Sequence, residues 1–151
     1  MLANEDITLL AGKYKLIQKK DGFRFSVDAV ILSDFFAYPK KGKILDIGTG
    51  NGVIPILLFS EKKGEDITGI DIQKKNIELN CLKENIKIVH GDVKEYSMGN
   101  SFDYIVSNPP YMKVDGKKQN ILSCKSIARH EIKLNLSQLV QSAKRLLKPV
   151  G

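Results

Sequence analysis

Short apolar runs alternate with longer amphipathic stretches along most of the chain. The runs have the length and the β-branched content of buried strands, and the stretches between them carry apolar residues at helical spacing. Strands are predicted at residues 43–47, 66–72, 86–90 and 101–107, and helices at 26–37, 53–62, 73–84 and 136–148. This alternation predicts right-handed crossovers and an α/β fold with a parallel, doubly wound sheet.

The first 25 residues follow a different pattern. Residues 7–20 alternate loosely between apolar and polar side chains, with Gly12 and Lys13 in a turn position between two extended stretches. A β-hairpin or extended arm is therefore predicted over residues 1–25, ahead of one domain over residues 26–151. A chain of 151 residues is long enough to build a single hydrophobic core.

The end of the chain lacks the strand that should follow the last helix. In this kind of fold a helix that ends in a turn delivers a further strand, but only Pro149, Val150 and Gly151 remain. We therefore expect an incomplete sheet in a fragment of a longer protein, with the fourth strand uncovered along its outer edge. Because an uncovered edge can pair with a second copy, a dimer through this edge is a further expectation.

Composition argues against several classes of protein. No apolar run approaches the ~20 residues of a membrane helix, and residues 1–6 have neither the basic nor the apolar part of a secretory signal. Cys81 and Cys124 lack the spacing of metal ligands. We expect a cytoplasmic protein with no bound metal and no membrane contact.

The net charge of +7 has two explanations. Lysines recur along the whole chain, including residues 112–133, where the regular pattern of strands and helices stops. A solvated, lysine-rich surface accounts for the charge, and so does electrostatic contact with a polyanion such as tRNA. Composition alone favours neither explanation.

A glycine-rich turn follows the first strand of the domain. Its residues Gly48-Thr49-Gly50-Asn51-Gly52 stand between that strand and the next helix. Glycine permits positive φ and a close approach of the backbone to a ligand, so the turn predicts a nucleotide-type ligand above the carboxyl end of the strand. The spacing G-x-G-x-G differs from the G-x-G-x-x-G of dinucleotide-binding folds, which disfavours an NAD dehydrogenase.

Three carboxylates come at or near the ends of the first three strands of the domain. Asp71 follows the glycine turn by roughly 20 residues, where an acidic group binds ribose hydroxyls, and its position at the carboxyl end of a strand favours this role over a cap of the next helix. Asp92 can accept a hydrogen bond from the exocyclic amine of adenine, or it can simply belong to a turn. Asp46 is expected to hold the N–H groups of the glycine turn and to receive an ammonium group, because a buried carboxylate needs donors. With Ile72 and Val93 beside them, these residues predict a ligand with an adenosine end and an amino-acid end, as in S-adenosylmethionine.

The sharpest motif is Asn108-Pro109-Pro110-Tyr111, directly after the fourth strand. Two prolines make a stiff turn, so the Asn108 side chain and the Pro109 carbonyl should face one fixed point. Both can accept hydrogen bonds from a planar amine, and Tyr111 offers a face on which a flat substrate stacks. A plain proline turn explains Pro109 and Pro110 alone, but not the flanking Asn and Tyr. The tetrapeptide therefore predicts methyl transfer to a planar nitrogen.

These motifs resemble those of class I S-adenosylmethionine-dependent methyltransferases with an NPPY motif, which have a Rossmann-like fold. Residues 46–52 and 108–111 carry that resemblance, and residues 23–32 and 128–131 narrow it to the bacterial tRNA-valine adenine-N6 methyltransferases. The resemblance implies S-adenosylmethionine as cofactor and RNA as substrate, with tRNA favoured. It also implies that the last three strands of the family's seven-stranded sheet are absent.

The predicted site follows from the motifs and the resemblance together. The catalytic set is Asn108, Pro109, Pro110 and Tyr111, and the cofactor set is Asp46, Gly48, Thr49, Gly50, Gly52, Asp71, Ile72, Asp92, Val93 and Asn108. The resemblance places Asn108 and Tyr111 at the target base. Roles for Arg24, Arg129 and His130 stay open.

Two alternative functions remain. Glutamine-N5 methyltransferases of release factors use the same tetrapeptide but carry a helical domain ahead of the glycine turn. Only about forty residues precede Asp46 here, too few for a domain of usual size. The other alternative is a non-catalytic fragment that binds S-adenosylmethionine without transferring its methyl group.

Overall fold

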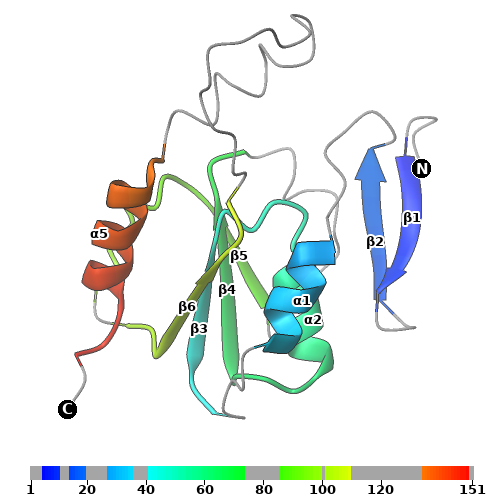
Figure 1. Cartoon of the computed structure of the whole chain (residues 1–151), viewed down its shortest axis with the longest axis horizontal. Coiled ribbons are helices and arrows are strands. Elements are labelled where there is room, and N and C mark those ends of the chain that lie inside the picture. Colours follow the sequence, from blue (N-terminus) through cyan, green and yellow to red (C-terminus); the bar gives the residue numbers. More distant parts are fainter. Residues whose placement is uncertain are drawn as a thin grey trace, which may run out of the picture.

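A four-stranded parallel sheet forms the centre of the molecule, with its strands in the order β5-β4-β3-β6. The computed structural model describes residues 5–10, 14–19, 27–35, 41–73, 86–99, 101–109 and 134–149. Its strands are β3 (Lys43–Ile47), β4 (Asp66–Asp71), β5 (Ile86–His90) and β6 (Tyr104–Ser107). Helices α1 (Val27–Phe35) and α2 (Val53–Ser60) lie on one side of the sheet and α5 (Leu136–Leu146) on the other (Figure 1). The predicted parallel α/β sheet is confirmed.

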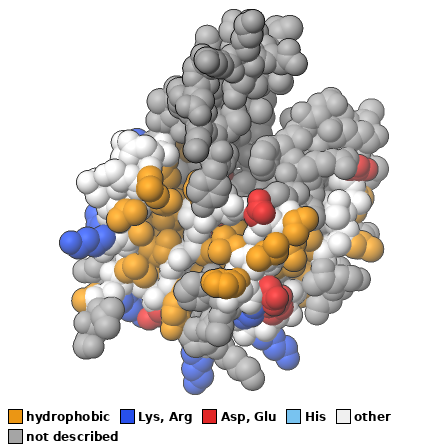
Figure 2. Space-filling view, in the orientation of Figure 1, with side chains coloured by type: hydrophobic (Ala, Val, Ile, Leu, Met, Phe, Trp, Pro, Cys, Tyr) orange, Lys and Arg blue, Asp and Glu red, His pale blue; other side chains and the backbone are white. Residues whose placement is uncertain are grey.

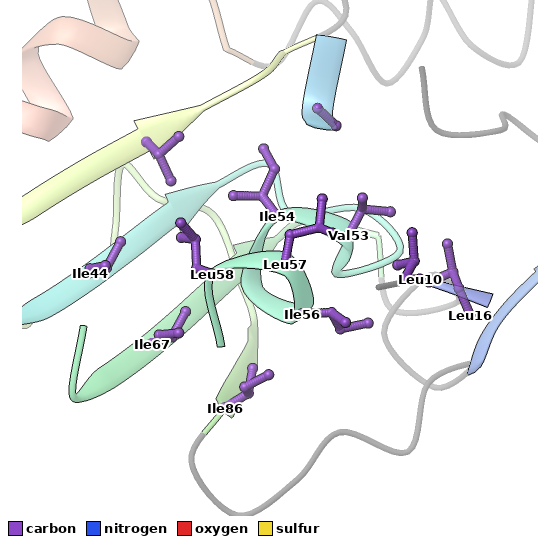
Figure 3. Packing of buried hydrophobic residues seen from close by; sticks show 12 residues of the cluster. Leu10, Leu16, Ile44, Val53, Ile54, Ile56, Leu57, Leu58, Ile67 and Ile86 are labelled. Atoms are coloured by element: carbon purple, nitrogen blue, oxygen red, sulfur yellow. The ribbon is translucent and has the colours of Figure 1, made fainter. Parts of the chain in front are cut away.

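The two faces of the sheet support two separate hydrophobic clusters. Ile44, Ile67 and Ile86 are register partners on neighbouring strands and belong to the cluster that includes α2 (Figure 3). Ile47 and Ile70 are also register partners, and they belong to the cluster that includes Leu146 of α5. Because side chains alternate along a strand, a continuous apolar run covers both faces, as a sheet between two helical layers requires.

Helix α2 is almost entirely apolar, and six of its residues from Val53 to Leu58 are buried. Pro55 lies in its first turn, where a missing N–H costs no hydrogen bond. A hairpin of β1 (Glu5–Leu10) and β2 (Tyr14–Lys19) confirms the predicted hairpin. Its buried Leu10 and Leu16 belong to the cluster that includes α2. Burial on several sides explains why α2 lacks a polar face.

Helix α1 buries its small residues and exposes most of its large ones. Ala29 and Ser33 are buried, whereas Val27 is 69% and Phe35 is 80% exposed. The helix packs against α2, and close packing of two helices favours small side chains at the contact. Figure 2 shows hydrophobic side chains gathered over α1 and over α5 on one face of the molecule.

The chain returns to the sheet after α5. The helix begins with a capping box between Asn135 and Gln138, and beyond its end Leu147 forms a parallel bridge with Phe102. Lys148 donates its N–H to the Phe102 carbonyl (2.9 Å), and its ammonium contacts the Asp103 carboxylate (2.7 Å). This bridge is isolated and lies just ahead of β6, and no strand follows α5 in the described part of the chain, as expected.

Some predicted boundaries shift. β6 begins at Tyr104 rather than at residue 101 because its partner β3 begins only at Lys43, and α2 ends at Ser60 rather than at residue 62. The predicted helix at 73–84 lies outside the described residues apart from its first position, and the whole segment 112–133 lies outside them as well. Among the described residues, no helix is long and apolar enough to cross a membrane.

Candidate active site at the carboxyl edge of the sheet

The predicted site residues gather along one edge of the sheet. Because the four strands are parallel, Ile47, Asp71, His90 and Ser107 end at the same side. The chain moves from β3 to β4 to β5 in one direction, and β6 then lies on the opposite side of β3. Ligands of open α/β sheets bind at such a reversal of strand order, and the glycine turn follows β3 at this point.

The backbone of the glycine turn requires its glycines. Gly48, Gly50 and Gly52 have φ values of 75°, 53° and 75°, in the left-handed region that other residues rarely adopt. The N–H groups of Gly48 and Thr49 both donate to the Ile70 carbonyl, at 2.8 and 3.1 Å. A Cβ atom built on Gly48 or Gly50 would meet nothing within 4 Å. The turn is thus fixed to the end of β4 and leaves open space beside its backbone.

Asp71 links the end of β4 to the glycine turn. Its Oδ2 accepts the N–H of Gly50 (2.8 Å), and its Oδ1 accepts the N–H of Gln73 (2.7 Å). The second contact is the cap-like role that the sequence made the weaker alternative. A carboxylate oxygen can accept two hydrogen bonds, so each oxygen retains capacity for a ligand hydroxyl. Binding to ribose therefore remains compatible with both observed contacts, and it stays a prediction.

Asp46 is the most unusual group of the site. Its side chain is 1% exposed, and neither carboxylate oxygen has a hydrogen-bond partner in the described part of the chain. Burial raises the pKa of Asp46 from 3.8 to about 7; the nearby Thr49 hydroxyl lowers it in part, and the negative charge of Asp71 raises it further. The expectation that Asp46 holds the N–H groups of the turn was wrong, because Ile70 and Asp71 accept those of Gly48, Thr49 and Gly50.

Thr49 packs into the sheet rather than away from it. Its side chain is buried, and a Cβ built on Gly69 of β4 would lie 2.6 Å from Thr49 Oγ1. Gly69 is the register partner of Asp46, so a glycine in mid-strand makes room for Thr49 beside the buried carboxylate. Sequence reasoning missed Gly69, although a glycine inside a strand is a known sign of close backbone approach.

Asp92 begins a tight turn after β5. Its Oδ1 accepts the N–H of Lys94 (2.9 Å), and its Oδ2 lies 3.3 Å from the Lys94 ammonium. These contacts match the plain turn that the sequence allowed, and a contact of Asp92 with adenine stays a prediction. The Val93 side chain is buried in the cluster beneath α5, and Ile72 is half-buried with its carbonyl 3.1 Å from His90 Nε2.

Asn108 lies at the end of β6, one strand away from the glycine turn. The Ser107 hydroxyl donates to the Ile47 carbonyl (2.7 Å), which ties this end of β6 to the end of β3. Asn108 is half-buried and lines an open hollow of about 300 Å³, together with Ser107 and side chains of α1. Pro109 is also half-buried. Pro110 and Tyr111 lie outside the described residues, so their roles stay predictions.

The described residues contain no cluster of three or more His, Cys, Asp or Glu side chains that could hold a metal ion. The polar groups that gather at this edge are the buried, unpaired carboxylate of Asp46, the Asp71 and Asp92 carboxylates with spare acceptor capacity, and the Asn108 amide. This set suits a ligand that carries a cation and several N–H or O–H donors.

Comparison with known proteins identifies the family. The model of a family described as "Methyltransferase small domain" matches residues 26–151. The chain belongs to this methyltransferase family. The matched region contains the whole parallel sheet, the glycine turn and Asn108.

Two curated relatives of this methyltransferase domain share a name. A tRNA1(Val) (adenine(37)-N6)-methyltransferase of Tolumonas auensis is 27% identical over 147 residues, which cover 92% of this chain and 61% of the relative. A protein of the same name from Bacteroides thetaiotaomicron is 32% identical over 144 residues, which cover 87% of this chain and 58% of the relative. The chain thus spans 58–61% of the length of these two relatives.

Solved structures show the same fold. Pyrococcus horikoshii TYW2 in complex with MeSAdo aligns with a TM-score of 0.65 and 13% identity, over 96% of this chain and 49% of that one. M. jannaschii TYW2 in complex with AdoMet aligns with a TM-score of 0.58 and 18% identity, over 74% of this chain and 53% of that one. At these identities the likeness concerns the fold.

Proposed function

We propose that the methyltransferase domain uses S-adenosylmethionine to methylate the exocyclic N6 of adenine in RNA, with tRNA as the favoured substrate. The observation that carries the proposal is the meeting of a buried, unpaired carboxylate, an open glycine turn and Asn108 at one edge of the sheet. The shared name of the curated relatives supports adenine and tRNA as targets. The neighbours solved with AdoMet and MeSAdo support the cofactor.

The described residues fit S-adenosylmethionine. The unpaired carboxylate of Asp46 suits the ammonium group of the cofactor's amino-acid end. The open space at Gly48 and Gly50 lets the cofactor approach the backbone of the glycine turn. Asp71 retains lone pairs for the ribose hydroxyls, and Asp92 retains acceptor capacity for the adenine amine. Thr49, Gly52, Ile72 and Val93 complete the proposed contacts. When bound, the cofactor supplies an electrophilic sulfonium methyl group.

Asn108 and the Pro109 carbonyl are proposed to act on the target amine. The lone pair of an adenine N6 is conjugated with its ring, so the amine is a poor nucleophile. Acceptors on both N–H bonds favour a pyramidal nitrogen and stabilise its growing positive charge. The nitrogen bonds the methyl carbon as the carbon–sulfur bond breaks, and it releases a proton to solvent afterwards, so no strong base is needed. Pro110 and Tyr111 are proposed to hold the base beside Asn108.

Methylation of a release-factor glutamine is the second candidate for the same chemistry, because an amide nitrogen is also planar. Transfer of labelled methyl groups from S-adenosylmethionine to unmodified tRNA and, separately, to a release factor distinguishes the two. We expect label in tRNA; label confined to the protein would overturn the RNA assignment. Cofactor binding without transfer to either would identify a non-catalytic, cofactor-binding fragment.

Replacing Asn108 with alanine tests the catalytic assignment. Loss of the amide oxygen removes an acceptor needed only as the nitrogen becomes positive, so methyl transfer should fall at least about a hundredfold. Cofactor affinity, measured by calorimetry, should stay within a few fold. Ser101→Ala is the matched control, because it removes a hydroxyl that donates to the Gly99 carbonyl, in the segment ahead of β6 and away from Asn108. Unchanged turnover in the Asn108→Ala variant would refute the assignment.

We also propose that the protein acts in the cytoplasm, where unmodified tRNA is available.

Pairing of two copies along the outer edge of β6 stays a prediction. The bridge of Leu147 to Phe102 already occupies one end of that edge, so a second copy would pair along the remaining part. Sedimentation equilibrium over a range of concentrations distinguishes a monomer from a dimer.

A further inference from the structure

Arg145 of α5 binds the turn that follows β5. Its guanidinium donates to the carbonyls of Val93 (2.8 Å), Lys94 (3.2 Å) and Tyr96. These partners precede it by about fifty residues, so the contact joins two distant parts of the chain. One side chain thus serves three carbonyls within four consecutive residues.

The turn needs such a partner because only two of its carbonyls accept N–H groups within the turn itself. Glu95 donates its N–H to the Asp92 carbonyl (3.0 Å), and Tyr96 donates to the Val93 carbonyl (3.4 Å). These two bonds serve the Asp92 and Val93 carbonyls, whereas the Lys94 and Tyr96 carbonyls accept from Arg145. A guanidinium has five donors in a fixed planar arrangement, which allows one arginine to bind several carbonyls at once.

The packing around this contact holds the turn in one place. Val93 and Phe102 are buried with Leu146, the neighbour of Arg145 on α5, and the rings of Tyr96 and Phe102 stack at 6.5 Å. Hydrophobic contact fixes how far the turn lies from α5. It does not fix rotation of the turn about its own axis, whereas three directed hydrogen bonds do.

We infer that Arg145 is a positioning residue for recognition of the adenine ring of the cofactor. Asp92 is the first residue of the turn and the proposed acceptor for the adenine amine, and it lies within four residues of all three carbonyls. Arg145 acts through the turn and touches neither the cofactor nor the target base. This inference rests on the proposed binding of S-adenosylmethionine.

The test compares two ligands that differ at the adenine amine. S-adenosylhomocysteine carries the amine, and S-inosylhomocysteine carries a carbonyl in its place. The wild-type chain should bind the first more tightly, because Asp92 accepts from the amine. In Arg145→Lys the affinity for S-adenosylhomocysteine should fall about tenfold, as expected for loss of charge-assisted hydrogen bonds that hold the acceptor. The preference for the adenosyl ligand over the inosyl ligand should shrink at the same time.

Lys144→Ala is the control, because Lys144 is the exposed basic neighbour on the same helix. Arg145→Lys keeps the charge and the long side chain, so it tests positioning even if Arg145→Ala fails to fold. A general loss of stability would weaken the binding of both ligands equally, and that result would overturn the inference. An unchanged preference for the adenosyl ligand in a folded Arg145→Lys variant would overturn it as well. Failure of the wild-type chain to bind S-adenosylhomocysteine would instead overturn the proposed function.

Discussion

Replacing Asp46 with asparagine separates the energetic cost of burying a carboxylate from its use in binding a cation. The substitution keeps the shape of the side chain and removes the charge. Asp46 lies on β3 with no hydrogen-bond partner for either oxygen among the described residues, so little else in the fold should change. We expect the variant to be more stable than the wild-type chain at alkaline pH and weaker in cofactor binding.

The size of the stability difference between Asp46→Asn and wild type follows from the pKa of Asp46, which burial raises from 3.8 to about 7. The unfolded chain loses the Asp46 proton at lower pH than the folded chain does, so stability falls as the pH rises from about 4 to about 7 and stays low above that. Each pH unit in this window contributes about 1.4 kcal/mol. Between pH 5 and pH 8.5, the stability of Asp46→Asn relative to wild type should therefore rise by about 3 kcal/mol.

Urea unfolding at several pH values between 5 and 8.5 measures this difference. Asp66→Asn is the control, because Asp66 is an exposed carboxylate at the start of β4, away from the site. A pH-dependent rise of the same size in this control would mark a general effect of removing a carboxylate and contradict the role of burial. A stability difference between Asp46→Asn and wild type that stays constant across this range would refute the argument.

Cofactor affinity should show the opposite trend. An ammonium group beside Asp46 favours the ionised carboxylate, so wild-type affinity for S-adenosylmethionine should increase as the pH rises through 7. The ratio of wild-type to Asp46→Asn affinity cancels the titration of the ligand itself. We expect this ratio to reach at least about tenfold above pH 7, as for a hydrogen bond to a charged group. A ratio near one at pH 8 would show that Asp46 does not receive the ammonium.

Two further substitutions test the support beneath the glycine turn. Gly69→Ala should lower the free energy of unfolding by about 1–3 kcal/mol, because the new Cβ would lie 2.6 Å from Thr49 Oγ1. Thermal unfolding measures this change. The control is Gly99→Ala, which should cost much less because its Cβ would make only an ordinary contact at 3.5 Å. Asp71→Ala should speed hydrogen exchange at the Gly50 amide, which loses its acceptor, and should weaken cofactor binding about tenfold or more. Unchanged exchange at Gly50 would contradict the contact between Asp71 and the turn.

The sequence by itself determined the order of strands and helices and the edge at which the site lies. Apolar runs of strand length alternate with helical stretches, and this pattern depends only on neighbours along the chain. Parallel strands end at one edge, so motifs placed after their last residues must meet there. For that reason the positions of Gly48, Asp71, Asp92 and Asn108 around one site could be predicted without a structure.

Only the tertiary structure decided which groups satisfy one another across that edge. The Gly50 N–H reaches Asp71 rather than Asp46, and this choice leaves Asp46 buried and unpaired. Gly69 lies under Thr49, and Arg145 binds carbonyls about fifty residues earlier in the chain. Such contacts depend on strand register and helix placement, which fix distances of a few ångströms between residues far apart in sequence. Local periodicity carries no information at that precision, and so the protonation state of Asp46 and the partner of the Asp92 turn emerge only from the folded chain.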